Sequence, residues 1–245
     1  DAEAALKTND DPGMVDVSDF MAFKDAVAAS TEADFATRME PHLDLDYLAR
    51  YIVVDRAIAN TDGIMAFYFG TGWGPENQNY NWYDVGGGRF TLIPWDLDKA
   101  FWYPEPNFWS DNAPHDNGPV PNWNVSTQYC AGYLCDFDSV IVSDGVTQRG
   151  SYGVREIDCD PFLKLLRAQI YGRQQAIADA FIAGPFSEAS VGAKVEAWRA
   201  QIADGMQEDP LVDSAQWQSS VDALLADVPR LQQNLSLMMS GLISQ

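Results

Sequence analysis

The segment Arg89 to Phe101, RFTLIPWDLDKAF, constrains the fold of this chain most tightly. Its residues Thr91–Ile93 favour a β-strand, whereas Pro94 lacks the N–H group that a strand ladder needs. The sequence therefore predicts that a strand ends at this proline, with Asp96 and Asp98 just beyond it. Residues in that position often carry binding or catalytic groups.

The two carboxylates, one residue apart, suggest a cation site. On a continuing strand, alternate residues share a face, so Asp96 and Asp98 could point the same way. Like charges that close repel unless a cation or a shared proton lies between them. A divalent cation with oxygen ligands, Mg²⁺, Mn²⁺ or Ca²⁺, resolves the repulsion most simply. The alternative is a pair of solvated turn carboxylates.

The residues upstream form a recognisable order. An apolar, helix-like segment from Leu45 to Ala59 ends in N-T-D-G, and the segments NYNWY, GGG and IPWDLD follow in turn. This order resembles that of the spore coat protein H (CotH) kinase family, in which a helix ends in N-x-D before an N-Y-x-x-Y strand, a G-R-F turn and I-P-W-D-x-D. The segments DVSDFMAFKDAV and CDPFLKLL extend the similarity to nearly the whole chain.

The resemblance implies roles for individual residues. Asp62 looks like the catalytic-loop aspartate, which lies near the acceptor hydroxyl, and Asn79 looks like the metal-binding asparagine. Asp96, with Asp98 beside it, looks like the metal-binding aspartate. The implied reaction uses ATP with Mg²⁺ or Mn²⁺, and Ca²⁺ is an alternative ion. For Asp62, a structural residue of a helix-end turn is the alternative.

The asparagine assignment has two competitors. Family members usually present a doubled asparagine before the aromatic pair, whereas Gln78 precedes Asn79 here. Asn77 and Asn81 are therefore alternative counterparts.

The resemblance also implies that part of the kinase lies elsewhere. The chain has no G-x-G-x-x-G motif and no lysine on a convincing strand before Asp62. The family places the strands that bind the nucleotide upstream of the region that this chain resembles. We therefore expect residues 1–245 to be a single domain portion, the helical lobe and metal centre, without the N-terminal nucleotide lobe. The start at Asp1 favours a processed product or an excised domain, and ATP binding by this portion alone is expected to be weak.

Charge restricts the partners. The formal net charge is −21, from 36 acidic and 15 basic residues. Nucleic acid is excluded as a ligand class, because neutralising phosphates needs Lys and Arg. No run of apolar residues is long enough for a membrane span. A basic substrate or a salt-tolerant source explains the charge, and with the resemblance we expect basic, Ser-rich secreted or coat proteins as partners. The oligomeric state stays open.

The cysteines favour export to the extracellular space or to a cell or spore surface. Cys130 and Cys135 lie in a long loop-rich region, residues 102–158, and Cys159 follows it. One disulfide with one odd cysteine is expected. A bond from Cys130 or Cys135 to Cys159 is favoured over Cys130–Cys135, because a longer closed loop constrains the unfolded chain more.

The predicted fold class is α+β: a helix-dominated, atypical kinase-like large lobe with a small antiparallel sheet or hairpin in the middle, over about Ile64 to Ile93. Ser18, Asp44 and Asp160 are predicted helix caps, and Thr31 with Asp34 resembles a capping box. Later helices are expected over Ser190 to Ala203 and about Gln216 to Leu242, the last kinked or restarted at Pro229. The adjacent Asp55 and Arg56 form either a buried or an exposed pair, and the exposed pair is favoured.

Two functions fit these observations. One is an atypical secreted protein kinase that transfers the γ-phosphoryl group of ATP to Ser or Thr of secreted or coat proteins. The other is a non-catalytic surface or coat-assembly module that retains a kinase-like lobe.

Overall fold

Six helices and a short hairpin make up most of the described structure. The computed structural model describes residues 15–60, 63–65, 77, 79–101, 160–210 and 213–240, and the backbone alone of 68–69, 133–135, 140–143, 146–149 and 152–154. The helices are α2 (Ser18–Ala28), α3 (Phe35–Met39), α4 (Leu45–Ala57), α5 (Pro161–Ala183), α6 (Glu188–Glu208) and α7 (Ser214–Met239). The strands are β1 (Tyr68–Phe69), β2 (Tyr80–Asp84), β3 (Phe90–Pro94), β4 (Tyr133–Cys135), β5 (Val140–Ser143), β6 (Val146–Arg149) and β7 (Tyr152–Val154), and η1 (Leu97–Lys99) is a 3₁₀ turn. The predicted helix-dominated α+β class is confirmed.

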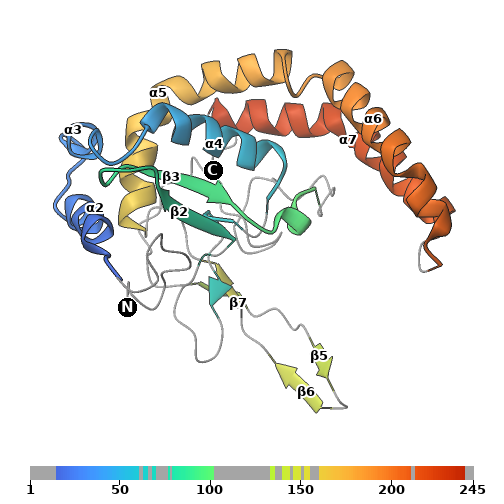
Figure 1. Cartoon of the computed structure of the whole chain (residues 1–245), viewed down its shortest axis with the longest axis horizontal. Coiled ribbons are helices and arrows are strands. Elements are labelled where there is room, and N and C mark those ends of the chain that lie inside the picture. Colours follow the sequence, from blue (N-terminus) through green and yellow to red (C-terminus); the bar gives the residue numbers. More distant parts are fainter. Residues whose placement is uncertain are drawn as a thin grey trace.

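Three helices form the centre of the molecule. α4, α5 and α7 pack against one another beside the β2–β3 hairpin, whereas α6 and α7 continue together as a projecting arm (Figure 1). α2 and α3 contact α5 near the other end of the hairpin. None of the described helices combines the length and hydropathy of a membrane span.

Local capping rules explain most helix starts. The Asp44 carboxylate accepts hydrogen bonds from the backbone N–H groups of Asp46 and Tyr47, and α4 begins as predicted. Asp160 caps α5 in the same way, and Pro161 occupies the first helical position, where no N–H donor is needed.

Other predicted boundaries differ from the structure. Ser18 is the first residue of α2 and not its cap, because the Asp16 carboxylate accepts the Ser18 N–H. Asp34 accepts the Thr31 N–H as in a capping box, but α3 begins only after this turn. α6 is longer than predicted at both ends, and α7 runs through Pro229 without restarting.

The hairpin has a single antiparallel register. β2 pairs with β3 from Asp84↔Phe90 to Tyr80↔Pro94, so the ladder ends at the proline, as predicted. Phe90 and Leu92 are buried against the helices. At the turn, Gly88 has φ +72°, and an added Cβ would lie 3.3 Å from Asp19 Cγ. A side chain there would be strained and crowded, which explains the glycine.

The predicted start of the sheet is wrong. Ile64 and Met65 lie in a turn and are buried, and β1 begins only at Tyr68. β1 pairs with β7, more than eighty residues later in the chain, so its partner could not be inferred from nearby sequence. β4 to β7 lie inside the region predicted as a long loop; the remaining residues of 102–158 lie outside the described part of the chain.

An aromatic cluster joins the first helices to the hairpin and to α5. The Phe23 ring centroid lies 5.4 Å from those of Trp82 and Phe90 and 6.1 Å from that of Phe162. Such pairs contribute about 0.5–1.5 kcal/mol beyond their buried area. The cluster therefore fixes the hairpin on the helical core.

Candidate active site

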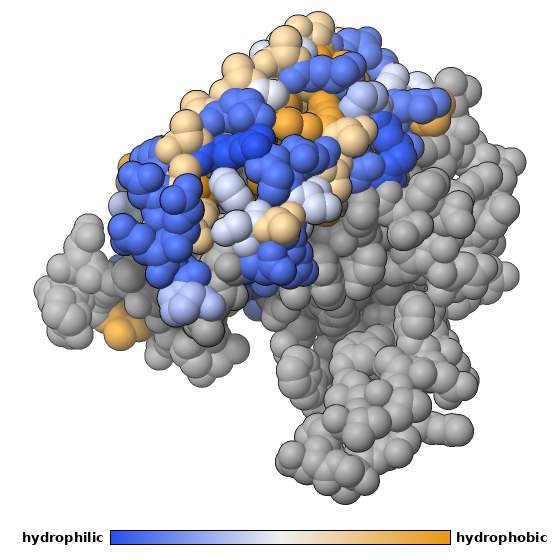
Figure 2. All heavy atoms as spheres, turned by 90° about the vertical axis from the view of Figure 1, so that its right-hand side faces the viewer, coloured by the Kyte–Doolittle hydropathy of each residue, from blue (hydrophilic) through white to orange (hydrophobic). Residues whose placement is uncertain are grey.

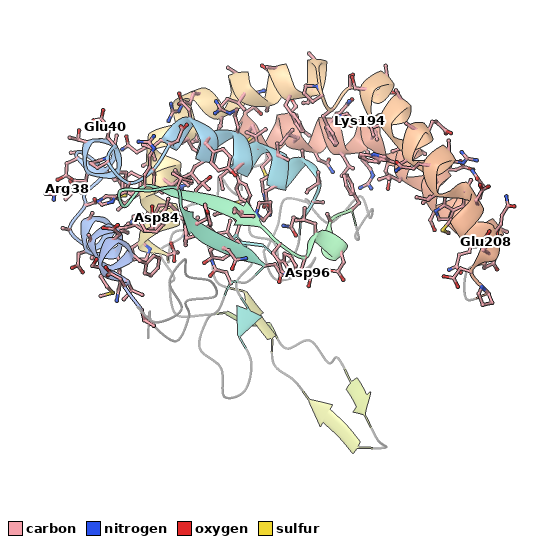
Figure 3. The ribbon with its side chains drawn as sticks, in the orientation of Figure 1. Arg38, Glu40, Asp84, Asp96, Lys194 and Glu208 are labelled. Atoms are coloured by element: carbon pink, nitrogen blue, oxygen red, sulfur yellow. The ribbon has the colours of Figure 1, made fainter. Side chains whose placement is uncertain are left out.

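Asp96 lies where the chain leaves β3. It has φ 49° and ψ 60°, the left-handed conformation, and η1 follows at once (Figure 3). Asp96 and Asp98 are both exposed. The predicted position past the strand end is confirmed. The reasoning that strand alternation aligns the two carboxylates is wrong, because the strand geometry stops before Asp96.

Left-handed backbone recurs around this turn. The described non-glycine residues with positive φ are Ala59, Asn79, Asp96 and Phe101. Asp and Asn tolerate this conformation better than most residues, but it still costs energy and clusters at functional sites. Two of the four are residues that the sequence selected as metal ligands.

Two backbone hydrogen bonds join these residues or their immediate neighbours. The Trp95 N–H donates to the Asn79 carbonyl oxygen at 2.8 Å, so the turn that holds Asp96 is tied to the start of β2. The Phe101 N–H donates to the Ile58 carbonyl oxygen at 2.8 Å, at the end of α4. The carboxylate turn is thus attached on one side to the hairpin and on the other to α4.

Contacts set one of the three candidate asparagines apart from the other two. Asn77 donates to the Ile64 carbonyl oxygen at 2.6 Å and accepts from the Tyr80 hydroxyl at 3.0 Å, so its amide is held in a structural role. Asn81 lies within β2, opposite Ile93, and is exposed. Within the described residues, no hydrogen bond engages the Asn79 amide. The same holds for the Asn81 amide, and Asn79 is partly buried where Asn81 is exposed, so the role of Asn79 as a ligand stays a prediction.

Asp62 and Thr61 lie outside the described residues, but Asn60 and Gly63 on either side of them are described. Asn60 is 1% exposed and Gly63 is buried. An added Cβ on Gly63 would lie 2.5 Å from Asn60 Nδ2, so the hydrogen-bonded amide of Asn60 would have to move. Asn60 and Gly63, the described residues on either side of Thr61 and Asp62, are therefore closely packed against each other.

A buried ion pair lies at the end of α4 and contacts Asn60. Arg56 donates to the Asp55 carboxylate at 2.6 Å, and the two residues are 1% and 3% exposed. The favoured prediction of an exposed pair is wrong, because α4 is covered on nearly all sides. Asn60 Nδ2 donates to the second Asp55 oxygen at 2.8 Å. Sequence reasoning missed this contact; its only signal was an asparagine five residues after an aspartate at a helix end.

Two partly buried tyrosines, Tyr51 and Tyr80, lie near Asp55 and Asn77 respectively. Burial, with the nearby Asp55 carboxylate adding to it, raises the pKa of Tyr51 far above its usual range. Within the described residues its hydroxyl has no hydrogen-bond partner. Burial, followed by the charge of Asp160, raises the pKa of Tyr80 to about 12.

These tyrosines predict a loss of stability at alkaline pH. Both pKa values are raised above the unfolded value of about 10, so the unfolded state loses its phenolic protons first. The stabilisation is complete below about pH 10 and declines as pH rises toward 12, by about 2 kcal/mol for Tyr80 alone. Urea unfolding at several pH values from 8 to 11 measures the loss. The double substitution Tyr51→Phe with Tyr80→Phe should flatten the profile, and an unchanged slope would contradict the assignment.

The described side chains suit a hard cation only in part. They include no group of three His, Cys, Asp or Glu that could hold a metal by themselves. Mg²⁺ is usually bound by one or two carboxylates together with waters and substrate phosphates. Asp96, Asp98 and the Asn79 amide oxygen would supply that kind of incomplete set.

The cysteine predictions stay untested. Cys130 and Cys159 lie outside the described residues, and Cys135 is described only through its backbone in β4.

Fold and site together define a helix-dominated α+β domain that presents an acidic turn at a strand end. Residues 2–130 match the family described as CotH kinase protein, and the chain belongs to this family. The matched range contains Asp62, Asn79, Asp96 and Asp98 and ends before α5. No curated protein and no solved structure matches the chain.

Proposed function

We propose that this chain is the metal-binding portion of an atypical, exported protein kinase. It would act outside the cell or at a cell or spore surface, and transfer the γ-phosphoryl group of ATP to Ser or Thr of secreted or coat proteins. One observation carries the proposal: Asp96 is held in a left-handed turn whose preceding residue is bonded to Asn79. That arrangement brings together the two residues that the family pattern assigns to the metal.

The proposed roles follow the needs of phosphoryl transfer, in which positioning and electrostatics supply most of the catalysis. Asp96, Asn79 and Asp98 would hold Mg²⁺ or Mn²⁺ through oxygen atoms. The bound ion would neutralise charge on the phosphate oxygens. Asp62 would accept a hydrogen bond from the acceptor hydroxyl and orient it toward the phosphorus.

The surface supports basic, Ser-rich proteins as acceptors. The net charge is −21, and the described, coloured part of the face in Figure 2 is mainly hydrophilic, with hydrophobic patches between. A field of this sign attracts Lys- and Arg-rich chains and repels acidic ones, and salt weakens it.

The test is transfer of label from γ-labelled ATP to basic, Ser-rich peptides in the presence of Mg²⁺ or Mn²⁺. The whole chain is expected to label them weakly, and the protein with any upstream sequence its gene encodes more strongly. Asp62→Ala should lower transfer by about 10²- to 10⁴-fold, the usual contribution of a positioned acid or base. Full labelling by Asp62→Ala would reject the role of this residue.

A second function, a non-catalytic surface or coat-assembly module, has one observation in its favour. None of the strands that the structure describes carries a lysine, which a kinase uses to hold the ATP phosphates. The same assay separates the two functions: a folded protein that labels none of the acceptors with either ion would favour the module.

A further inference from the structure

Buried polar groups are concentrated at the C-terminal end of α4. Asp55, Arg56 and Asn60 are three of the four polar or charged residues that are buried in the described part of the chain. Burying such groups is costly, and a buried ion pair is a weak source of net stability. Their concentration directly before Asp62 therefore calls for a role beyond stabilising the helix.

Asp55 and Arg56 hold Asn60 through both its side chain and its backbone. Asn60 Nδ2 donates to Asp55 Oδ1 at 2.8 Å, and the Asn60 N–H donates to the Asp55 carbonyl oxygen at 3.1 Å. The Arg56 guanidinium joins Asp55 Oδ2, at 2.6 Å, to the Asn60 carbonyl oxygen, at 2.8 Å. Charge-assisted bonds of this kind are stronger than neutral ones and fix geometry.

The same segment is connected to both candidate carboxylate regions. On one side Gly63, bonded directly to Asp62, packs against the Asn60 amide so closely that a Cβ does not fit. On the other side the carbonyl oxygen of Ile58 accepts the N–H of Phe101, three residues after Asp98. Ala59, between Ile58 and Asn60, takes the left-handed conformation that permits both connections.

We propose that Asn60 is a positioning residue: anchored by Asp55 and Arg56, it holds Gly63 and the end of α4, the described residues on either side of the candidate catalytic residue, relative to the Asp96–Asp98 turn. The catalytic part of this inference rests on the function proposed above. The physical connection between residues 58–63 and Phe101 does not, and it can be tested without any assay of activity.

Amide hydrogen exchange measures the connection directly. Asn60→Ala is expected to speed exchange at the Phe101 amide by at least about tenfold, because local opening becomes easier by roughly 1.4 kcal/mol. The Phe90 amide, which donates to the His42 carbonyl oxygen, should be unaffected. Unchanged exchange at Phe101 would overturn the proposal.

Asn60→Asp provides a variant in which the hydrogen bond to Asp55 can be restored by lowering the pH. Its carboxyl group would face Asp55 beside Arg56, with the Tyr51 hydroxyl nearby. When protonated, it can donate to Asp55 Oδ1 as the Asn60 amide does; when ionised, it repels that carboxylate. Slow exchange at Phe101 should therefore return at pH 5 and be lost at pH 8, after correction for the intrinsic rate. A variant with the same protection at both pH values would also contradict the proposal.

Kinetics then separate positioning from stability. Asn60→Ala should lower kcat by about 10- to 100-fold with KM for ATP nearly unchanged, as expected when a reacting group is misplaced by about 1 Å. The matched control is Gln174→Ala, which also removes a buried amide, bonded to the Met239 carbonyl oxygen, but far along α5. It should lower stability and leave kcat and Phe101 exchange unchanged. If the wild-type chain transfers no phosphoryl group, the proposed function fails, and the two exchange experiments still decide the connection.

Discussion

Replacing Asp96 by asparagine is expected to lower phosphoryl transfer by about 10²- to 10³-fold without unfolding the protein. Asn keeps the size of the side chain and tolerates the left-handed backbone at this position. It removes the negative charge that the proposed site needs to hold Mg²⁺ or Mn²⁺. Alanine is a poorer test, because it would add backbone strain to the loss of charge.

The measurement is initial-rate label transfer at saturating ATP, with Mn²⁺ affinity determined by calorimetry. Asp84→Asn is the matched control, since Asp84 ends the other strand of the hairpin and accepts the Gly86 N–H, as an amide oxygen also can (Figure 3). Its activity should stay within about twofold of wild type, because surface changes are usually of little consequence. An equal fall in both variants would mean that the acidity of the hairpin, and not the Asp96 site, supports the activity.

Arg56→Ala is expected to destabilise the fold by about 3–5 kcal/mol. The substitution leaves the Asp55 carboxylate buried at 3% exposure with its cationic partner gone, and it also removes the bond to the Asn60 carbonyl oxygen. Loss of this magnitude is a large part of the stability of a single domain. Thermal unfolding followed by circular dichroism measures it.

Arg38→Ala is the control for that experiment. Arg38 pairs with Asp34 on the surface, where both side chains are more than a third exposed, and such pairs contribute little. Its melting temperature should stay close to that of the wild type. A similar fall in melting temperature in both variants would show that the buried pair contributes no more to stability than the surface pair.

Local rules explain what the sequence predicted correctly. Pro94 ends a ladder, Asp44 caps a helix and Pro161 begins one for reasons contained within a few residues. The acidic turn after the strand followed from the same reasoning.

Tertiary contacts explain what the sequence did not predict. The burial of Asp55 and Arg56 depends on helices that come more than a hundred residues later. The left-handed turn at Asp96 likewise depends on the hydrogen bond from Trp95 to Asn79 and on the bond from Phe101 to Ile58. No periodicity in the sequence encodes either feature.

The hairpin register has a consequence for how this family can vary. Asp96 and the glycine turn lie at opposite ends of a ladder of five residue pairs. Because side chains alternate along a strand, removing one residue from β3 would move Phe90 or Leu92 to the wrong face and displace Asp96. Gly86 and Gly87 face open space, so insertions between them would leave the ladder in register. Insertions and deletions among family members should therefore occur mainly at Gly86–Gly87. The two strands should keep a constant length, which holds the acidic turn at a constant distance from the glycine turn.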